Sequence, residues 1–97
     1  MSSNIAESEA YKEFESRHNR HLNMLSDGDR NIRRQALNEL KKAVSQVKNK
    51  AILEFFYRER LCKRLILCLE DQIEKNREIS IEILTDCIER CGLKEES

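Results

Sequence analysis

Four cysteines and two histidines are the side chains of this sequence best suited to chemistry. They are Cys62, Cys68, Cys87, Cys91, His18 and His21. Thiolate and imidazole are ligands that zinc prefers, and a spacing of four residues places Cys87 and Cys91 on one helix face. A zinc- or thiol-dependent activity is therefore one functional hypothesis for the chain.

The surroundings of these residues favour a structural role instead. Structural zinc sites usually take paired cysteines from loops, whereas these cysteines lie within helical apolar patterns. Small buried thiols explain such positions better. The histidines have no nucleophile or carboxylate at a fixed spacing, and the sequence contains no Gly-rich phosphate loop or nucleophile elbow. We therefore predict no catalytic residue, no metal site and no cofactor.

One segment carries a local excess of positive charge. Residues 30–50 hold seven basic side chains and a single acid, Glu39. Three of the basic residues, Arg34, Lys41 and Lys48, are seven positions apart. This spacing predicts a basic ridge on the solvent side of a helix. The ridge is either a solvated face or a docking strip for an acidic partner; nucleic acid fits less well because no aromatic residues interleave the charges. The candidate partner-binding residues are Arg30, Arg34, Lys41 and Lys48.

The composition indicates long helices joined by short turns. Proline is absent, glycine occurs only at positions 28 and 92, and 37% of the 97 residues are charged, with a net charge of zero. This length predicts a single domain, residues 1–97. Balanced charge selects neither nucleic acid nor an anionic membrane. With no long apolar run and no signal-peptide pattern at the start, we expect a cytoplasmic protein with reduced cysteines.

Apolar periodicity predicts four helices, at about residues 7–25, 29–47, 51–70 and 74–91. The expected buried stripes are Tyr11, Phe14, His18, Leu22 and Leu25 in the first; Ile32, Ala36, Leu37, Leu40, Val44 and Val47 in the second; and Ile81, Leu84, Ile88 and Cys91 in the fourth. The third is apolar over more than half of its circumference, which predicts burial on several sides. Ser8 is a candidate N-cap of the first helix, and Asp27 or Asp29 of the second. Both glycines suit a positive φ at a helix end.

Two stretches 44 positions apart resemble each other, which is typical of a helical-hairpin repeat. Asp27 and Arg33 of the first correspond to Asp71 and Arg77 of the second. The expected repeats cover residues 8–47 and 50–91. We predict that these four residues form a structural signature, in which the turn carboxylate caps the next helix and binds a neighbouring guanidinium.

One difference between the repeats is informative about stacking. Gln35, Glu39 and Ala43 of the first correspond to the apolar stripe Ile79, Ile83 and Cys87 of the second. Either this stripe packs back on the first repeat, which then acts as a cap, or it awaits a third repeat. Because two hairpins are fewer than such arrays usually need, we expect further repeats or a partner chain on the C-terminal face.

The pattern from Leu25 through Asp27, Ile32-Arg33 and Ala36 to Leu40 resembles the HEAT repeat. The second copy departs from it at Asn76, where an aliphatic residue is expected, and at Ser80. More narrowly, the Arg33–Lys42 and Arg64–Leu69 segments resemble the N-terminal part of the HEAT-repeat axonemal dynein assembly factors. This resemblance implies a role in cytoplasmic preassembly of ciliary dynein arms, with dynein intermediate chain or chaperones as partners.

Taken together, the sequence predicts an all-α fold, an α-α superhelix of the HEAT or armadillo type with two stacked antiparallel hairpins. The leading functional hypothesis is a non-catalytic protein-interaction scaffold for dynein arm preassembly, which binds neither nucleic acid nor membrane. The alternatives are a microtubule or transport adaptor that uses the basic ridge, and the zinc- or thiol-dependent activity at the cysteines.

Overall fold

The structure, a computed structural model, describes residues 4–92. After a short 3-10 turn, Ile5–Glu7, the elements are α1 (Glu9–Met24), α2 (Arg30–Gln46), α3 (Lys50–Phe56), a π-helical segment (Tyr57–Leu61), α4 (Cys62–Cys68) and α5 (Glu74–Cys91). No strand occurs in this part of the chain, so the all-α prediction is confirmed.

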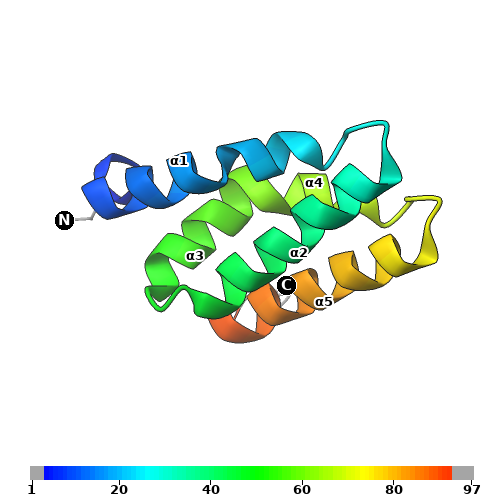
Figure 1. The fold of residues 1–97 in the computed structure, drawn as a ribbon. Helices are drawn as coiled ribbons and strands as arrows, with labels where there is room; N and C mark the ends of the chain where they lie inside the picture. The colour runs from blue at the N-terminus through cyan, green and yellow to red at the C-terminus, as the bar shows by residue number, and fades with distance from the viewer. Residues whose placement is uncertain (1–3, 93–97) are drawn as a thin grey trace.

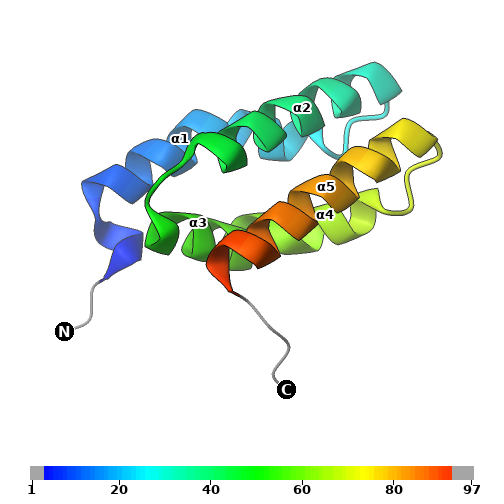
Figure 2. The same ribbon diagram turned by 90° about the horizontal axis from the view of Figure 1, so that it is seen from below.

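The elements form two antiparallel hairpins that stack on each other. The first hairpin is α1 with α2, and the second is the run from α3 to α4 with α5. Helix α2 packs along α5, and the two interhelix turns lie side by side at one end of the molecule, drawn in cyan and yellow (Figure 1). Figure 2 shows the same pairing from a second direction, with α1 and α2 in one layer and the second hairpin in the other.

Local capping explains where the helices begin and end. The side chains of Ser8, Asp29 and Asn49 accept backbone N–H groups of the following helix at 3.1, 2.7 and 3.2 Å. Gly92 ends α5 with a φ of 64°, as expected for a glycine at this position. The expectation for Gly28 is wrong: its φ is not positive, and the first turn reverses the chain without a left-handed residue.

The core confirms the first expected stripe and most of the second. All five residues of the first stripe are buried, as are Ala36, Leu37, Leu40 and Val44 of α2, whereas Ile32 and Val47 are only partly buried. Aromatic rings join the first helices of the two hairpins edge to face, Tyr11 with Phe55 and Phe14 with Phe56, each at a centroid distance of 4.9 Å. Such contacts add to the apolar area that the stacking buries.

The predicted continuous third helix is interrupted by the π-helical segment Tyr57–Leu61. In an unbroken α-helix, the apolar positions before and after residue 57 would point in directions about 100° apart, the rotation of one residue. A π turn holds one more residue than an α turn and absorbs this change of phase. Phe56, Tyr57, Leu61 and Leu65 consequently all reach the core.

The buried stripe expected for the fourth helix is only partly right. Cys91 is buried and Leu84 partly buried, but Ile81 is 53% and Ile88 42% exposed. The residues buried instead are Ile79, Ile83 and Cys87. The helix is apolar on two stripes, and the one that packs back on α2 is the one that is polar in the first hairpin. The structure therefore supports the first account of that stripe, in which it packs back on the first hairpin.

Candidate functional site

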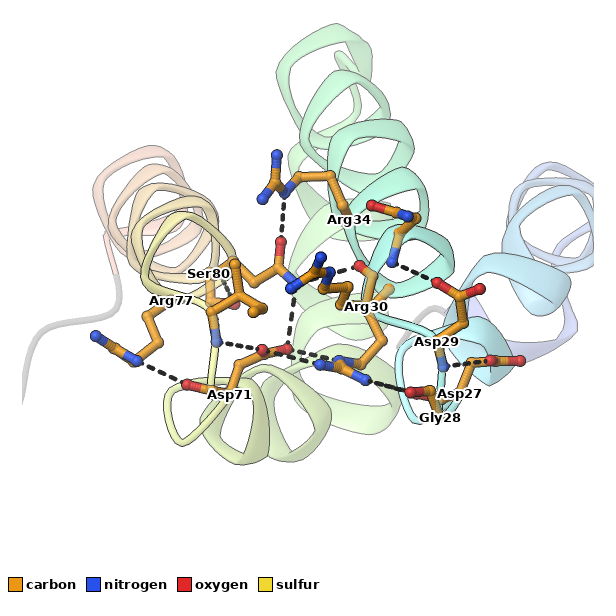
Figure 3. A network of polar contacts seen from close by, with 12 residues as sticks. Asp27, Gly28, Asp29, Arg30, Arg34, Asp71, Arg77 and Ser80 are labelled. Atoms are coloured by element: carbon orange, nitrogen blue, oxygen red, sulfur yellow. Dashed lines mark hydrogen bonds and ion pairs between the residues drawn. The ribbon is translucent and has the colours of Figure 1, made fainter.

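The most elaborate polar structure of the molecule lies where the two interhelix turns meet (Figure 3). The Arg33 guanidinium, from the first turn of α2, donates to both oxygens of Asp71 in the turn before α5. The Nε–Oδ2 distance is 2.7 Å and the Nη2–Oδ1 distance 3.1 Å. The side chain of Asp71 is only 2% exposed and that of Arg33 18% exposed. This two-point geometry is the strong form of an arginine–carboxylate pair.

Both turns are built in the same way around their signature residues. The Asp27 carboxylate accepts the Asp29 N–H at 2.8 Å, and the Asp71 carboxylate accepts the Ile73 N–H at 2.8 Å. In each hairpin the arginine six residues later donates to the carbonyl of that aspartate, at 2.9 Å in the first and 2.8 Å in the second. The structure thus places all four predicted signature residues in equivalent positions.

The two arginines differ in one respect. Arg33 binds its own turn and also the carboxylate of the following hairpin, so it joins the two repeats. Arg77 donates to the Asp71 carbonyl, and within residues 4–92 it takes part in no ion pair. The inter-repeat pair therefore has a direction, from the arginine of one hairpin to the aspartate of the next.

The Asp71 carboxylate is strongly stabilised in its ionised form. The hydrogen bonds from Arg33 lower its pKa to about 2, helped by the Ile73 N–H and the Asn76 amide and opposed by burial. The same contact raises the pKa of the Arg33 guanidinium. Both partners of this ion pair are charged at any physiological pH. The pair is therefore a permanent contact between the two hairpins.

Asn76 is part of this network, a role that was not predicted from the sequence. It is fully buried in the first turn of α5, and its Oδ1 accepts from the Arg34 Nε at 2.5 Å. Its amide nitrogen donates to the Arg30 carbonyl at 3.4 Å and to the Asp71 carboxylate at 3.3 Å. The available signal was the polar residue at a position where the repeat pattern expects an aliphatic one.

Further contacts tie the hairpins together along their length. Arg90 near the end of α5 donates to the Val44 and Val47 carbonyls at the end of α2. At the other side of the molecule, Arg60 binds the Glu15 carboxylate at 2.6 Å and the Asn19 side chain at 2.9 Å. Polar contacts at several points therefore fix the stacking angle in addition to the apolar core.

The predicted basic ridge is only partly a free surface. Arg34 is half-buried against Asn76, and the Lys41 ammonium pairs with the Glu82 carboxylate of α5 at 2.7 Å. Arg30 and Lys48 are exposed, at the beginning of α2 and just beyond its end. The expectation that the ridge lies on the solvent side is confirmed for Lys41 and Lys48, which are exposed, and is wrong for Arg34, which is partly buried. Partner binding by these four residues stays a prediction.

The structure buries three of the four cysteines and brings the two histidines together. Cys68, Cys87 and Cys91 are buried, and burial raises the pKa of all three thiols, that of Cys87 to about 12. No group of three or more potential metal ligands occurs between residues 4 and 92. His18 and His21 approach to 3.4 Å between their Nδ1 atoms, and burial followed by the charge of His21 lowers the His18 pKa.

The geometry therefore defines an α-helical repeat protein, in which two hairpins of similar sequence share a seam of apolar and charged contacts. The chain belongs to the dynein axonemal assembly factor 5-like family: the family's sequence model, described as "Dynein axonemal assembly factor 5-like, TPR repeats", matches residues 24–97. The chain is also 40% identical over 79 residues to dynein axonemal assembly factor 5 of Xenopus laevis, which is 80% of this chain.

These 79 residues span only 9% of the Xenopus protein. No solved structure matches the chain. The family description names tetratricopeptide repeats, whose period is about 34 residues, whereas the 44 positions between Asp27 and Asp71 correspond to the longer HEAT or armadillo unit. Both are stacked helical hairpins, so the family match and the structure agree on the class of fold. No helix in the described part of the chain is apolar and long enough to cross a membrane.

Proposed function

We propose that this chain is a non-catalytic scaffold segment that acts in the cytoplasm in the assembly of axonemal dynein arms. The observation that carries the proposal is membership of a family named for dynein axonemal assembly factors, together with 40% identity to such a protein. The seam supports it, because paired hairpins held by a core and by several ion pairs form a stable surface of fixed shape.

The partners that this function implies are proteins, namely dynein intermediate chain or chaperones. One candidate contact surface is the outer face shared by α2 and α5, where Lys41 and Lys42 lie beside Glu82 and Asp86 around a groove of about 550 Å³. Its charges are mixed, with basic groups on α2 and acidic groups on α5. Such a surface suits a folded protein partner with its own mixed charges better than it suits a polyanion.

The alternative functions receive less support. A microtubule or transport adaptor would use the basic ridge, but Lys41 is already paired with Glu82 and Arg34 with Asn76. A thiol-dependent activity would need a thiolate, and the raised pKa of Cys68, Cys87 and Cys91 keeps these groups protonated at neutral pH. Neither alternative is favoured by a specific feature of the site.

A chimera tests the proposal. In ciliated cells of Xenopus laevis that are depleted of dynein axonemal assembly factor 5, the aligned segment of that protein would be replaced by this chain. We expect the chimera to restore axonemal dynein arms, measured by immunostaining of dynein heavy chains in the cilia. A chimera with Arg33→Glu, expressed at the same level, is expected to restore fewer arms. A well-expressed chimera that leaves the cilia without arms would contradict the proposal.

A further inference from the structure

A groove of about 330 Å³ lies between the two hairpins, next to the interhelix turns. It is bounded by the end of α1, the start of α2, and α4 with the turn that follows it. Helix α1 packs on α3 but makes few close contacts with α4, so the ends of these two helices leave the groove open. The largely buried part of its lining consists of Leu22, Leu25, Cys68 and the Arg33–Asp71 ion pair. We call it the α1–α4 groove.

Leu67 of α4 lines this groove and is 71% exposed, more than any other large apolar side chain between residues 4 and 92. Single exposed leucines are common on protein surfaces. Leu67 differs from them because two core leucines, Leu22 and Leu25, line the same groove. An apolar side chain placed there would cover Leu67 and contact the core leucines at the same time, which favours binding by the hydrophobic effect.

The stacking of hairpins does not cover the position of Leu67. The residue 44 positions earlier is Asn23, which is exposed although the second hairpin stacks on the first. Ile66 behaves differently, because its counterpart Leu22 is only 1% exposed. A position that stacking leaves open thus carries asparagine in one hairpin and leucine in the other. The leucine therefore favours an occupant that is not a neighbouring hairpin.

The charges of the groove indicate what kind of occupant fits. Arg33 and Asp71 neutralise each other. Arg64 is partly buried and donates one hydrogen bond, to the Arg60 carbonyl at 3.0 Å, and Glu70 is exposed beyond the end of α4. Neither Arg64 nor Glu70 takes part in an ion pair within residues 4–92. They precede and follow the exposed leucine by three positions each. The groove therefore offers a cation and a carboxylate on either side of an apolar surface.

We propose that the α1–α4 groove binds a short segment of a partner protein in which a leucine or phenylalanine lies near an acidic residue. The apolar side chain enters the groove beside Leu25 and Leu67. The carboxylate pairs with the Arg64 guanidinium, which is partly desolvated and therefore binds a carboxylate more strongly than an exposed one does. A basic residue on the other side of the apolar one meets Glu70. The order acidic, apolar, basic is the complement of the groove.

This groove is separate from the mixed-charge face of α2 and α5, and the proposal does not depend on a role in dynein assembly. Its size also suits a side chain better than a larger ligand. Pockets for small molecules measure about 300 to 1,000 Å³, and this groove lies at the lower end of that range. One anchoring side chain with a charged neighbour is therefore the occupant that the groove accommodates.

A peptide selection tests the proposal. A phage-displayed library of random 12-residue peptides is panned on the 97-residue chain. Peptides that also bind the Leu67→Asn variant are removed, since this variant carries in α4 the residue that α1 has at the equivalent position. We expect the remaining peptides to place Asp or Glu within about four positions of a Leu or Phe. Their Kd, measured by fluorescence polarisation of labelled synthetic peptides, should rise at least about tenfold for Arg64→Gln, a variant not used in the selection.

Two further variants are matched controls. Ile66→Asn loses an exposed apolar side chain next to Leu67 but outside the groove, and Lys63→Gln loses an exposed positive charge next to Arg64. Both should bind the peptides within about twofold of the unsubstituted chain. Circular dichroism melts confirm that each variant is folded, which is expected because none of the four positions is in the core.

A selection that returns no binder would overturn the proposal, as would peptides that lack an acidic residue or that bind Arg64→Gln unchanged. Binding that Ile66→Asn weakens as much as Leu67→Asn does would overturn it too, because the peptide would then lie on the open face of the second hairpin. All of these outcomes leave the proposed role in dynein assembly untouched.

Discussion

Arg33 and Asp71 form a two-point ion pair across the boundary between the hairpins, at 2.7 and 3.1 Å. The Asp71 carboxylate also caps the start of α5 through the Ile73 N–H, and the Arg33 guanidinium also holds the carbonyl of Asp27. This contact therefore joins the two turns and is one of several that fix the angle at which the hairpins stack. Arg33 and Asp71 are 38 positions apart in the sequence, so their contact stabilises the tertiary structure and not a local turn.

Replacing Asp71 should weaken the whole fold. Asp71→Asn keeps the size of the side chain but removes the charge that binds Arg33, and we expect a loss of about 2 kcal/mol in the free energy of unfolding. Asp27→Asn is the matched control, because Asp27 is exposed and caps only its own turn. Its expected effect is within about 0.5 kcal/mol in urea unfolding. Equal losses for the two variants would remove the inter-hairpin pair as the cause.

The same carboxylate predicts a pH dependence. The folded-state pKa of Asp71 is about 2, below the ordinary value of 3.8, so its ionised form contributes stability above about pH 4. This contribution is lost as the pH falls through the range from about 4 to about 2 and amounts to roughly 2 kcal/mol. The difference in unfolding free energy between the unsubstituted chain and Asp71→Asn should therefore shrink by this amount between pH 5 and pH 2. A constant difference would show that the pair does not titrate as described.

Asn76 is expected to matter more than its single side chain suggests. Asn76→Ala leaves the Arg30 carbonyl, the Arg34 guanidinium and the Asp71 carboxylate each without one partner. We expect a loss of about 2 to 3 kcal/mol in chemical denaturation, since the site is buried. Asn38→Ala on the exposed face of α2 serves as the comparison and should change stability by less than about 0.5 kcal/mol. Similar values for both would place Asn76 outside the network.

The sequence was informative wherever one helix face is apolar and the other polar. The stripe of α1, most of the stripe of α2 and the paired Asp and Arg residues follow from spacing, and the cap at Ser8 follows from residue type. For α2 the sequence offers Asp27 or Asp29 as the cap, and the structure shows Asp29. The sequence was ambiguous for α5, which is apolar on two faces. Periodicity shows that both stripes exist, but only the packing shows that Ile79, Ile83 and Cys87 are covered while Ile81 and Ile88 are exposed.

Two other features depended on tertiary structure in the same way. The π segment at Tyr57–Leu61 reconciles two apolar patterns of different phase, and a continuous apolar run conceals that change. The pairing of Lys41 with Glu82 joins residues 41 positions apart, on helices whose register the repeat alignment alone does not resolve. The basic ridge on α2 is therefore partly neutralised by an acidic side chain of α5.

The cysteines should differ greatly in reactivity. Cys87 is fully buried with a pKa of about 12, whereas Cys62 is only partly buried. We expect iodoacetamide at pH 7.5 to alkylate Cys62 at least about 100-fold faster than Cys87 in the folded protein, measured by peptide mass spectrometry. Full labelling of both in urea is the control for access. Rapid native labelling of Cys87 would instead support a reactive thiol.

The strongest test of the repeat geometry compares two residues that the 44-residue period makes equivalent. Leu37 is 0% exposed and Ile81 53% exposed. Leu37→Asp strands a charge between the hairpins, and we expect it to unfold the protein or to lower its stability by about 4 kcal/mol or more. Ile81→Asp places the same charge in solvent and should change stability by less than about 1 kcal/mol. Because the two positions carry similar side chains on equivalent helices, the contrast measures only what the neighbouring hairpin covers. Circular dichroism melts of both variants decide it, and two equal losses would mean that the hairpins do not stack through this face of α2.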